Sequence, residues 1–590
     1  MHDLIDRILA QPKPAEWQGC SGTKNLYLDI VERIVRNAAP WIDENGAVID
    51  PVINREWGQT SSRFASSCAV LIYFNRCCDL SEKLYKVMDY CCAGLNKDDS
   101  VDRSPNFWMR ELATAYDCLR KIAPAERVEY WRSELAKVEP EKNYIFVSPD
   151  VEKRKEFHNW AVYSSAGESM RESYGIGGGD FLWGNDFFDA YMEYQMWRFN
   201  EYGMYRDPGD PFTYDITTRL QLEAAISAGY NGRFKEILSE KLDFAMLPTL
   251  LFVAPTGEVP FGGRSSQFYF QEGIVSALCE RAAAVNRDKN PRLAGAYKRQ
   301  AYLSARAVCD GILRDDGKLF HIKNRFAPET RHGCDTYGHY SVYSLFAGSV
   351  FALAAIYADD TIQDMPAPSE LGNFSFALTE NFYKGFANGN GNYLEFDLKS
   401  DLDYDSSGLG RIFIKNMPFG LLPAAPFCQA GHFCIAPDLQ ANEYASAIAP
   451  EWYDRNRQYH RLAQYSEKTA SFREIAANIV EVIYETESSA VTYHADLSEC
   501  GRLTLEVSVS GNVSESFMIV PVLDFDGEQS PVLTLSDCGF QASFKNKLLK
   551  LTSCGTECCI SGRAVNRNGL YSLLKIKMPD NRITLHFSAE

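Results

Sequence analysis

The stretch that decides the fold is MPAPSELGNFSFAL, residues 365–378, where one spacing of apolar residues ends and another begins. Its first five residues, MPAPS, have the proline-rich composition of a linker. In its second half, Phe374, Phe376 and Leu378 alternate with smaller or polar residues. Because successive side chains of a β-strand point to opposite faces, this alternation predicts a strand with one buried face.

Alternation of the same kind recurs as far as the end of the chain. Strands with one apolar face are typical of antiparallel sheets, which bury that face and leave the other in water. We therefore expect residues 366–590 to form an antiparallel β-sandwich domain. The clearest further examples are Leu503, Leu505, Val507 and Val509, and then Ile583, Leu585 and Phe587.

The chain before residue 365 follows a helical spacing instead. Leu26, Ile30 and Ile34 lie at positions i, i+4 and i+8, which places them on one face of a helix. Many segments of this kind favour paired helices that curl into a toroid, and the lack of a repeat of fixed length argues against a solenoid. We expect residues 1–365 to form an (α/α) toroid, an incomplete barrel, with helices near 62–76, 81–94, 126–137, 157–173, 185–200, 213–228, 233–245, 267–285, 292–313 and 340–358.

The composition is that of a soluble, acidic protein with more than one domain. The 590 residues include 60 Lys and Arg against 78 Asp and Glu, which leaves a formal charge of −18. A field of this sign repels nucleic acid and anionic membranes, so neither is expected as a partner. No stretch approaches about 18 uninterrupted apolar residues, so no membrane-spanning helix is predicted. The oligomeric state, including a homo-oligomer, stays open.

The 17 cysteines and the N-terminus bear on location and cofactors. Many cysteines lie in apolar runs, where a free thiol acts as a small hydrophobic group. Because no signal peptide is visible, we expect reduced thiols and a cytoplasmic protein. No Cys-x-x-Cys pair with partner spacing and no complete phosphate-loop motif occurs. The sequence therefore predicts no metal site and no cofactor.

Two segments of the helical part combine polar residues with signs of a helix start. The first holds His158, Asn159 and Trp160, and its alternative interpretation is a helix capped by Asn159. The second holds Gly262-Gly263-Arg264, in which the glycines permit close backbone approach and the arginine favours a carboxylate. A tight turn with a solvated Arg264 is the alternative. Two further candidates follow in the same segment, Gln267 and Glu272.

A third segment, residues 331–343, is the densest group of potential acids and bases. It contains two of the nine histidines of the chain, His332 and His339. A buried core histidine is the alternative interpretation of each, and their separation of seven residues does not match the spacing of helical metal ligands. The segment also holds Asp335, Tyr337, Tyr340 and Tyr343.

A fourth group resembles a platform for a sugar ring, because flat aromatic side chains stand beside acids and arginines. An ordinary core between helices explains the same residues equally well. The candidates are Trp183, Tyr202, Tyr205, Arg206 and Asp215.

Asn, Arg, His and Tyr together suggest β-elimination at a uronic acid. The C5 proton of a uronate is weakly acidic until the neighbouring carboxylate is neutralised, which Asn159 and Arg264 are suited to do. A Tyr or His then removes the proton, and a Tyr protonates the leaving oxygen. Because a phenol is a poor base at its ordinary pKa, we expect Arg264 or Arg331 to lower the pKa of the tyrosine. The candidates for acid and base are Tyr337, Tyr340, His332 and His339.

A helical toroid followed by antiparallel sheets resembles the alginate lyase and heparinase II/III type of polysaccharide lyase. That resemblance implies an Asn, one or two His, a Tyr and an Arg across the toroid cleft. The matching residues here are His158 and Asn159, Arg264, and the cluster from His332 to Tyr343.

The alternative is a glycoside hydrolase on a similar toroid, such as a glucuronidase or an unsaturated-uronide hydrolase. It requires two carboxyl groups, for which Glu272 and Asp335 are the candidates, with Asp186 and Asp215 in reserve. A glycan-binding or scaffold protein is a further, non-catalytic alternative. Under either enzyme hypothesis we expect exo-action on an acidic oligosaccharide, with one end of the cleft closed near Trp17 or by a loop of the sandwich. Both enzyme hypotheses require the segments around residues 159, 264 and 337 to meet in one pocket.

Overall fold

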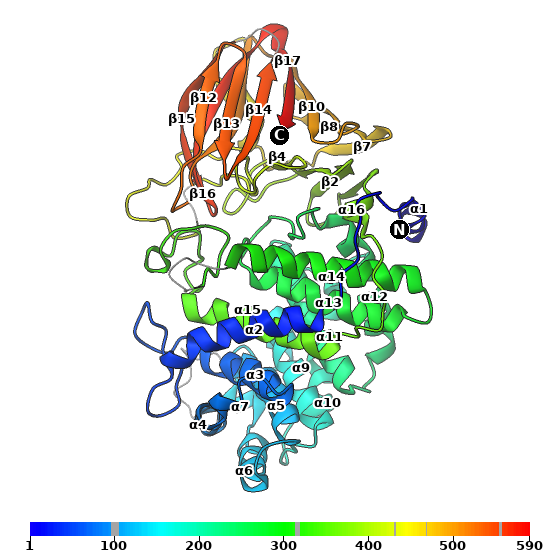
Figure 1. The fold of residues 1–590 in the computed structure, drawn as a ribbon, viewed down its shortest axis with the longest axis vertical. Coiled ribbons are helices and arrows are strands. Elements are labelled where there is room, and N and C mark those ends of the chain that lie inside the picture. The colour runs from blue at the N-terminus through cyan, green and yellow to red at the C-terminus, as the bar shows by residue number, and fades with distance from the viewer. Residues whose placement is uncertain (96–104, 313–318, 430–431, 468, 554–556) are drawn as a thin grey trace.

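The computed structural model describes residues 1–95, 105–312, 319–429, 432–467, 469–553 and 557–590. Helices occupy the chain as far as Leu371, and strands follow from Phe374 to Ala589. Figure 1 shows the helical part at one end of the molecule and the sheets at the other. The order of the two parts and the antiparallel sheets confirm the fold class predicted from the sequence.

Six helices form the inner layer of the helical part. In chain order each contacts the next, and α15 contacts both α13 and α3, so the ring is continuous and the predicted toroid is present. These helices carry few exposed residues, because both of their sides are covered by other helices. The inner helices are α3 (Thr60–Tyr73), α5 (Trp108–Leu119), α9 (Asn159–Ser173), α11 (Phe212–Ala228), α13 (Phe270–Asn286) and α15 (Tyr340–Tyr357).

The remaining helices lie outside this ring or at its edge. Several pair with an inner helix, as α10 does with α9 and α14 with α13. The outer helices are α1 (His2–Leu9), α2 (Lys24–Ala38), α4 (Ser81–Gly94), α6 (Ala125–Ala136), α7 (Pro140–Asn143), α8 (Val151–Arg154), α10 (Gly184–Met192), α12 (Lys235–Phe252), α14 (Pro291–Ile312) and α16 (Pro368–Leu371).

Helix α15 is the most apolar helix of the ring. By length and composition it qualifies as a candidate membrane span, but 89% of that window is buried inside the protein. Its apolar residues contact α2, α3 and α13, which explains its composition as that of a core helix.

A four-stranded sheet separates the ring from the rest of the β part (Figure 1). One face, which includes Phe374 and Phe386, packs into the core of the helical part. The other face, which includes Leu394 and Phe396, packs into the core of the β part. Because both faces are covered, β2 and β3 are buried throughout. The strands lie in the order β1 (Phe374–Leu378), β2 (Lys384–Gly389), β3 (Asn392–Asp397) and β4 (Gly408–Phe413).

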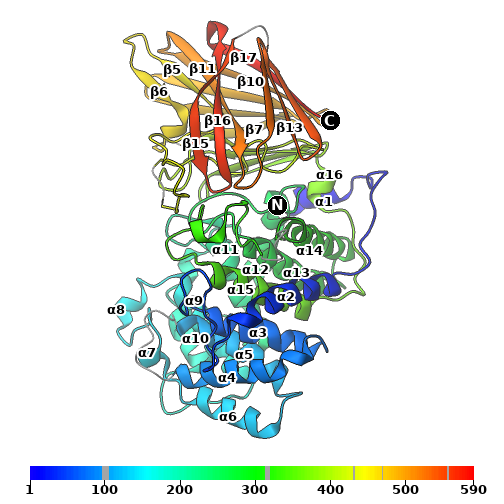
Figure 2. The ribbon, with the colours of Figure 1, turned by 60° about the vertical axis from the view of Figure 1, so that its left-hand side comes forward.

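Two larger antiparallel sheets enclose the second core (Figure 2). In the first, Leu505 pairs with Leu585 and Val507 with Ile583, as their alternation predicts. This sheet has the order β12 (Val532–Ser536), β13 (Gly539–Phe544), β14 (Lys547–Ser553), β17 (Arg582–Ala589), β10 (Arg502–Gly511), β9 (Ser489–Asp496), β8 (Ile479–Glu485) and β7 (Ser471–Ala476). The second has the order β15 (Cys558–Asn566), β16 (Gly569–Met578), β11 (Glu515–Phe525), β5 (Ala449–Tyr453) and β6 (Tyr459–Arg461).

Candidate active site

A cavity of about 310 Å³ opens at the N-terminal ends of the inner helices. Side chains from the first turns of α3, α9, α11, α13 and α15 line it, together with the loops that precede them. The segments around residues 159, 264 and 337 therefore meet in one pocket. The lining residues are Trp57, Gly58, Gln59, Arg63, Phe107, His158, Asn159, Trp160, Tyr163, Thr213, Tyr214, Thr217, Arg264, Ser265, Phe270, Tyr337, Val342, Tyr343 and Phe346.

The position of the cavity gives it a positive electrostatic character. Helix N-termini carry a partial positive charge and unpaired backbone N–H groups. The ring directs several of these ends at the same space, and the guanidinium groups of Arg63 and Arg264 add to them. None of the cavity-lining residues in the described ranges is Asp or Glu. The cavity therefore suits an anionic ligand, although the chain as a whole is strongly acidic.

A buried aspartate, Asp207, holds three of the lining residues together. Its Oδ1 lies 2.8 Å from Nδ1 of His158 and accepts a hydrogen bond of 2.9 Å from Nδ2 of Asn159. The backbone N–H of Asn159 donates to the same oxygen, and Nη2 of Arg264 forms an ion pair with Oδ2. One carboxylate thereby sets the positions of an imidazole, an amide and a guanidinium group.

Asp207 is placed to remain ionised. Burial disfavours its charge, but the contacts from His158 and Asn159 and the charge of Arg264 hold the pKa of this carboxyl below its ordinary value. When Nδ1–H of His158 donates to Asp207, the other ring nitrogen, Nε2, keeps a lone pair. The side chain of His158 is 27% exposed and lines the cavity, so Nε2 is available to a ligand.

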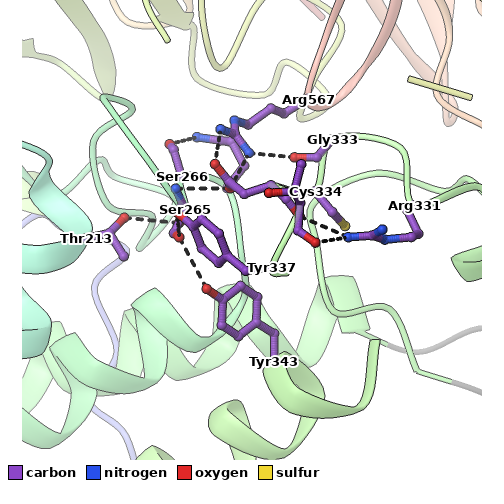
Figure 3. A network of polar contacts seen from close by, with 12 residues as sticks. Thr213, Ser265, Ser266, Arg331, Gly333, Cys334, Tyr337, Tyr343 and Arg567 are labelled. Atoms are coloured by element: carbon purple, nitrogen blue, oxygen red, sulfur yellow. Dashed lines mark hydrogen bonds and ion pairs between the residues drawn. The ribbon is translucent and has the colours of Figure 1, made fainter. Parts of the chain in front are cut away.

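Three tyrosines that line the cavity gather around Ser265, and Figure 3 shows two of them, Tyr337 and Tyr343. Ser265 Oγ donates to Tyr337 Oη over 3.1 Å and lies 3.3 Å from both Tyr343 Oη and Tyr214 Oη. The hydroxyls of Tyr214 and Tyr337 are 3.4 Å apart. Tyr337 is 38% exposed as a residue, yet its hydroxyl lies within this cluster.

Burial raises the pKa of each of these three phenols above its ordinary value. The guanidinium of Arg264 lies 4.9 Å from the ring of Tyr214 and opposes the shift, but burial outweighs it. Arg331 faces away, because Nη2 donates to the backbone oxygens of Asp335 and Thr336. The expectation that a nearby arginine depresses the tyrosine pKa is therefore wrong for the free site, and the phenols are proton donors at neutral pH.

The loop that carries Arg264 and Ser265 has an unusual backbone. Gly263 has φ +72°, and a Cβ there would lie 2.5 Å from Cβ of Pro211, so only glycine fits. Ser265 itself has φ +55°, a left-handed conformation that costs a non-glycine residue free energy. Its backbone N–H donates to Oδ2 of Asp335 over 3.1 Å, which helps hold the loop in place.

The β part also stabilises this loop, because one of its arginines binds Asp335. Arg567, in the turn between β15 and β16, binds both carboxylate oxygens of Asp335, with distances of 2.8 Å and 3.1 Å. The same guanidinium donates to the backbone oxygen of Gly333 over 2.6 Å. Figure 3 shows Arg567 on one side of Ser265 and the rings of Tyr337 and Tyr343 on the other. Asp335 thus positions the loop from outside the cavity and does not face a ligand.

Six of the residues singled out from the sequence line the cavity, and the others do not. Those that line it are His158, Asn159, Trp160, Arg264, Tyr337 and Tyr343. Each comes from the start of an inner helix or from the loop before one, where side chains point into the ring opening.

Three other residues of the third segment contact the surrounding protein and not the cavity: His332, His339 and Tyr340. Nε2 of His332 lies 3.0 Å from the backbone oxygen of Asn566, and its Nδ1 accepts from the N–H of Ala436. Burial lowers the pKa of His332 to about 4, so it is a neutral core histidine. The ring of His339 meets that of Trp57 in a tilted contact with centroids 4.4 Å apart, and Tyr340 donates to the backbone oxygen of Leu319. None of these three residues lines the cavity.

Three buried polar candidates are likewise committed to partners outside the cavity. Glu272 lies 2.6 Å from Nζ of Lys323, and Asp215 forms an ion pair with Arg219 at 2.7 Å. Gln267 accepts a hydrogen bond from Asn568 of the β part. With Asp335 bound to Arg567, neither carboxylate of the hydrolase hypothesis reaches the pocket.

The predicted sugar platform is not part of the cavity. Trp183 packs against the guanidinium of Arg171, and Tyr205 is buried with its hydroxyl bound to Gln195. Tyr202 packs on Phe376 of β1, and Arg206 pairs with Asp210 at 3.3 Å. Trp17, expected at a closed end of the cleft, donates instead to Glu370. Of these aromatic residues Tyr205 is fully buried, and Trp183 and Tyr202 are half-buried against neighbouring side chains.

Several residues of the site were missed because nothing local marks them. Asp207 looks like any loop aspartate, and Arg63 and Tyr163 lie within ordinary helical patterns. Ser265 follows Arg264 directly, and its neighbourhood of Gly262 and Gly263 is the signal that identifies the loop. Tyr214 stands in a segment already rich in polar residues, but sequence spacing alone does not bring it to the other tyrosines.

Within the described ranges, no group of three or more His, Cys, Asp or Glu side chains is arranged to hold a metal ion. The described cysteines are free thiols.

No protein-family model and no curated protein matches the sequence. Among solved structures the chain is similar to a heparinase III, with 8% identity, a TM-score of 0.49, and coverage of 100% of this chain and 88% of that one. It is similar to a heparan sulfate lyase from Pedobacter heparinus, with 9% identity, a TM-score of 0.47, and coverage of 98% and 84%. A glycosyl hydrolase family 88 protein from Bacteroides vulgatus matches 57% of this chain and 99% of its own, with 11% identity and a TM-score of 0.38. Function is therefore inferred from the cavity residues.

Proposed function

We propose that the protein is a lyase that cleaves uronic-acid-containing oligosaccharides by β-elimination. The observation that carries this proposal is the lining of the cavity. It joins an Asn–Arg–His group, which Asp207 holds together, to a cluster of protonated tyrosines, and it contains no carboxylate in the described ranges. This is the set of groups that elimination next to a carboxylate requires.

Asn159 and Arg264 are the groups proposed to bind the substrate carboxylate. Both are held by Asp207, so their donors are positioned before the substrate arrives. Nε of Arg264 is buried without a partner in the described structure, so it is available as an additional donor. Charge neutralisation by these donors stabilises the enolate-like intermediate that forms when C5 loses its proton.

His158 is the proposed base. With its Nδ1–H donated to Asp207, Nε2 accepts the C5 proton, and the resulting imidazolium is stabilised by the buried carboxylate. This assignment replaces His332 and His339, which lie outside the cavity. It also removes the need for an ionised tyrosine, which burial disfavours.

Tyr337 is the proposed acid that protonates the leaving glycosidic oxygen. Its phenol is protonated, lines the cavity and is partly exposed. Ser265 and Tyr214 hold its hydroxyl by contacts of 3.1 Å and 3.4 Å. When Tyr337 gives up its proton, the neighbouring hydroxyls of Ser265 and Tyr214 are placed to stabilise the phenolate.

A glycoside hydrolase remains the alternative enzyme class, but the cavity supports it less well. Its two catalytic carboxyl groups have to face the sugar. Glu272 and Asp335 are ion-paired away from the pocket, and Asp207 is covered by the three side chains it binds. A cavity of about 310 Å³ lies at the small end of ligand pockets, which supports action at the end of a short chain.

Incubation with a panel of uronate oligosaccharides tests the proposal. Elimination generates a 4,5-unsaturated product that absorbs in the ultraviolet, whereas hydrolysis releases saturated sugars without that absorbance. Tyr337→Phe is expected to reduce kcat by roughly 10²–10⁴-fold, the range for loss of a general acid. Tyr340→Phe is the matched control, because it removes a buried tyrosine hydroxyl outside the cavity. Saturated products, or equal losses in the two variants, contradict the proposal.

A further inference from the structure

Arg63 is a buried cation for which the described residues provide no acidic partner. It belongs to the first turn of α3 and lines the cavity, with only 4% of the residue exposed. Its Nη1 donates to the backbone oxygen of Val342 over 2.7 Å, and its guanidinium lies 3.9 Å from the ring of Phe346. Its Nε has no hydrogen-bond partner in the described structure.

Most other buried arginines of the helical part pair with an acid, whereas Arg198 donates to the backbone oxygen of Arg206. Arg171 lies 3.0 Å from Glu168, and Arg219 lies 2.7 Å from Asp215. The acid nearest in electrostatic terms to Arg63 is Glu111, which is already bound by Arg110 at 2.7 Å and by the hydroxyls of two serines. A buried charge without a counter-ion is costly, and the guanidinium stays protonated in proteins. The cost is removed when a ligand brings an anion to Arg63.

Arg63 and Arg264 face the cavity from different sides. Arg264 stacks on Tyr214 of α11 and is neutralised by Asp207. Arg63 belongs to α3, which is separated from α11 by two helices in either direction around the ring. The charge of Arg63 acts on Tyr163 and Tyr343, where it opposes the effect of burial on the pKa. The charge of Arg63 therefore acts on one member of the tyrosine cluster, Tyr343, whereas Arg264 contacts another, Tyr214.

We propose that Arg63 forms a second anion-binding subsite, which holds a carboxylate or sulfate group on the sugar ring next to the uronate that is cleaved. This inference rests on the proposed function and narrows its substrate to oligosaccharides with anionic groups on adjacent rings. Arg264 and Asn159 bind the first anion, next to the base. Arg63 binds the second among Phe270, Val342 and Phe346, where the apolar surroundings strengthen the interaction.

The test compares three uronate disaccharides whose neighbouring ring is a neutral N-acetylhexosamine, a sulfated hexosamine or a second uronate. The wild-type protein is expected to favour one or both anionic neighbours in kcat/KM by about tenfold or more. Arg63→Met, which keeps the length of the side chain, is expected to abolish that preference mainly through KM. Arg63→Lys keeps the charge and is expected to retain part of it. Comparison of kcat/KM between the disaccharide with a sulfated hexosamine and the disaccharide with a second uronate shows which anion the subsite accepts.

Stability provides an independent measurement. Because Arg63 is an unpaired buried charge, Arg63→Met is expected to leave Tm unchanged or to raise it. Arg219→Met, which strands Asp215, is the matched control and is expected to lower Tm. A clear loss of stability in Arg63→Met means that the arginine is structural and overturns the subsite.

The kinetic outcomes separate the two proposals. Unsaturated products without a preference for anionic neighbours overturn the Arg63 subsite and leave the lyase intact. If no disaccharide yields unsaturated product, the lyase proposal fails, and calorimetric binding of the sulfated disaccharide then decides the subsite. Equal affinity of the wild type and Arg63→Met for that disaccharide overturns it.

Discussion

Replacing Arg567 with methionine is expected to damage the proposed active site from the far side of the interface between the helical and β parts. Arg567 is 5% exposed and binds both oxygens of Asp335, which is 2% exposed. Removal of one partner of such a pair strands a buried charge and costs about 3–5 kcal/mol. Asp335 also accepts the backbone N–H of Ser265, so the loop that holds the tyrosine cluster loses its anchor.

The expected kinetic effect is a fall in kcat of about a hundredfold, because a shift of roughly 1 Å in catalytic groups has that effect. Urea unfolding measures the stability loss, and formation of unsaturated product measures kcat. Arg563→Met is the matched control: Arg563 lies on β15, the strand that leads into the turn of Arg567, but its side chain is 66% exposed. Its pair with Asp524 is expected to contribute about 1 kcal/mol or less.

The double variant Arg567→Met with Asp335→Asn distinguishes a stranded charge from a lost contact. Because the second change removes the uncompensated carboxylate, it is expected to restore part of the stability lost in Arg567→Met. If Arg567→Met unfolds at the same urea concentration as the Arg563 control and keeps its kcat, the reasoning is refuted.

Three further variants test other parts of the structure. Asp207→Asn is expected to lower kcat by roughly 10²–10⁴-fold, because His158 loses the carboxylate that sets its tautomer; kinetics across pH measure this. Burial raises the pKa of Glu395 from 4.5 to about 8, so the folded state holds its proton more tightly than the unfolded state does. Stability should therefore fall by up to about 5 kcal/mol as pH rises from about 4.5 to about 8, and urea midpoints should show that Glu395→Gln removes this fall. His332→Gln is expected to cost about 1–3 kcal/mol of stability, seen in urea unfolding, with kcat/KM unaffected, because its ring binds backbone groups outside the cavity.

Each of these three has an outcome that contradicts it. An unchanged kcat in Asp207→Asn removes the basis for His158 as the base. A pH dependence of stability that is the same with and without Glu395 shows that this carboxyl ionises normally in the folded protein. A large loss of kcat in the His332 variant, without loss of stability, returns that residue to the site.

The helical part and the β part could be predicted from the sequence because the spacing of apolar residues is a local property. The helical segments near 81–94 and 340–358 and the alternation at Phe374–Leu378 coincide with α4, α15 and β1. The residues His158, Asn159 and Arg264 were also recognisable, since polar groups at helix starts and beside paired glycines are unusual. These features depend on neighbours within a few positions, and sequence records those directly.

Which polar residues share the cavity was decided only by the closure of the helical ring and its docking on the sheets. His332 and His158 carry the same imidazole group, but their surroundings differ. His332 binds backbone groups of the β part, whereas His158 faces the pocket. Asp207 lies 48 residues from Asn159, and Arg567 lies 232 residues from Asp335. Ion pairing and burial at such separations depend on which helices and turns meet in space, and no short-range pattern encodes that meeting.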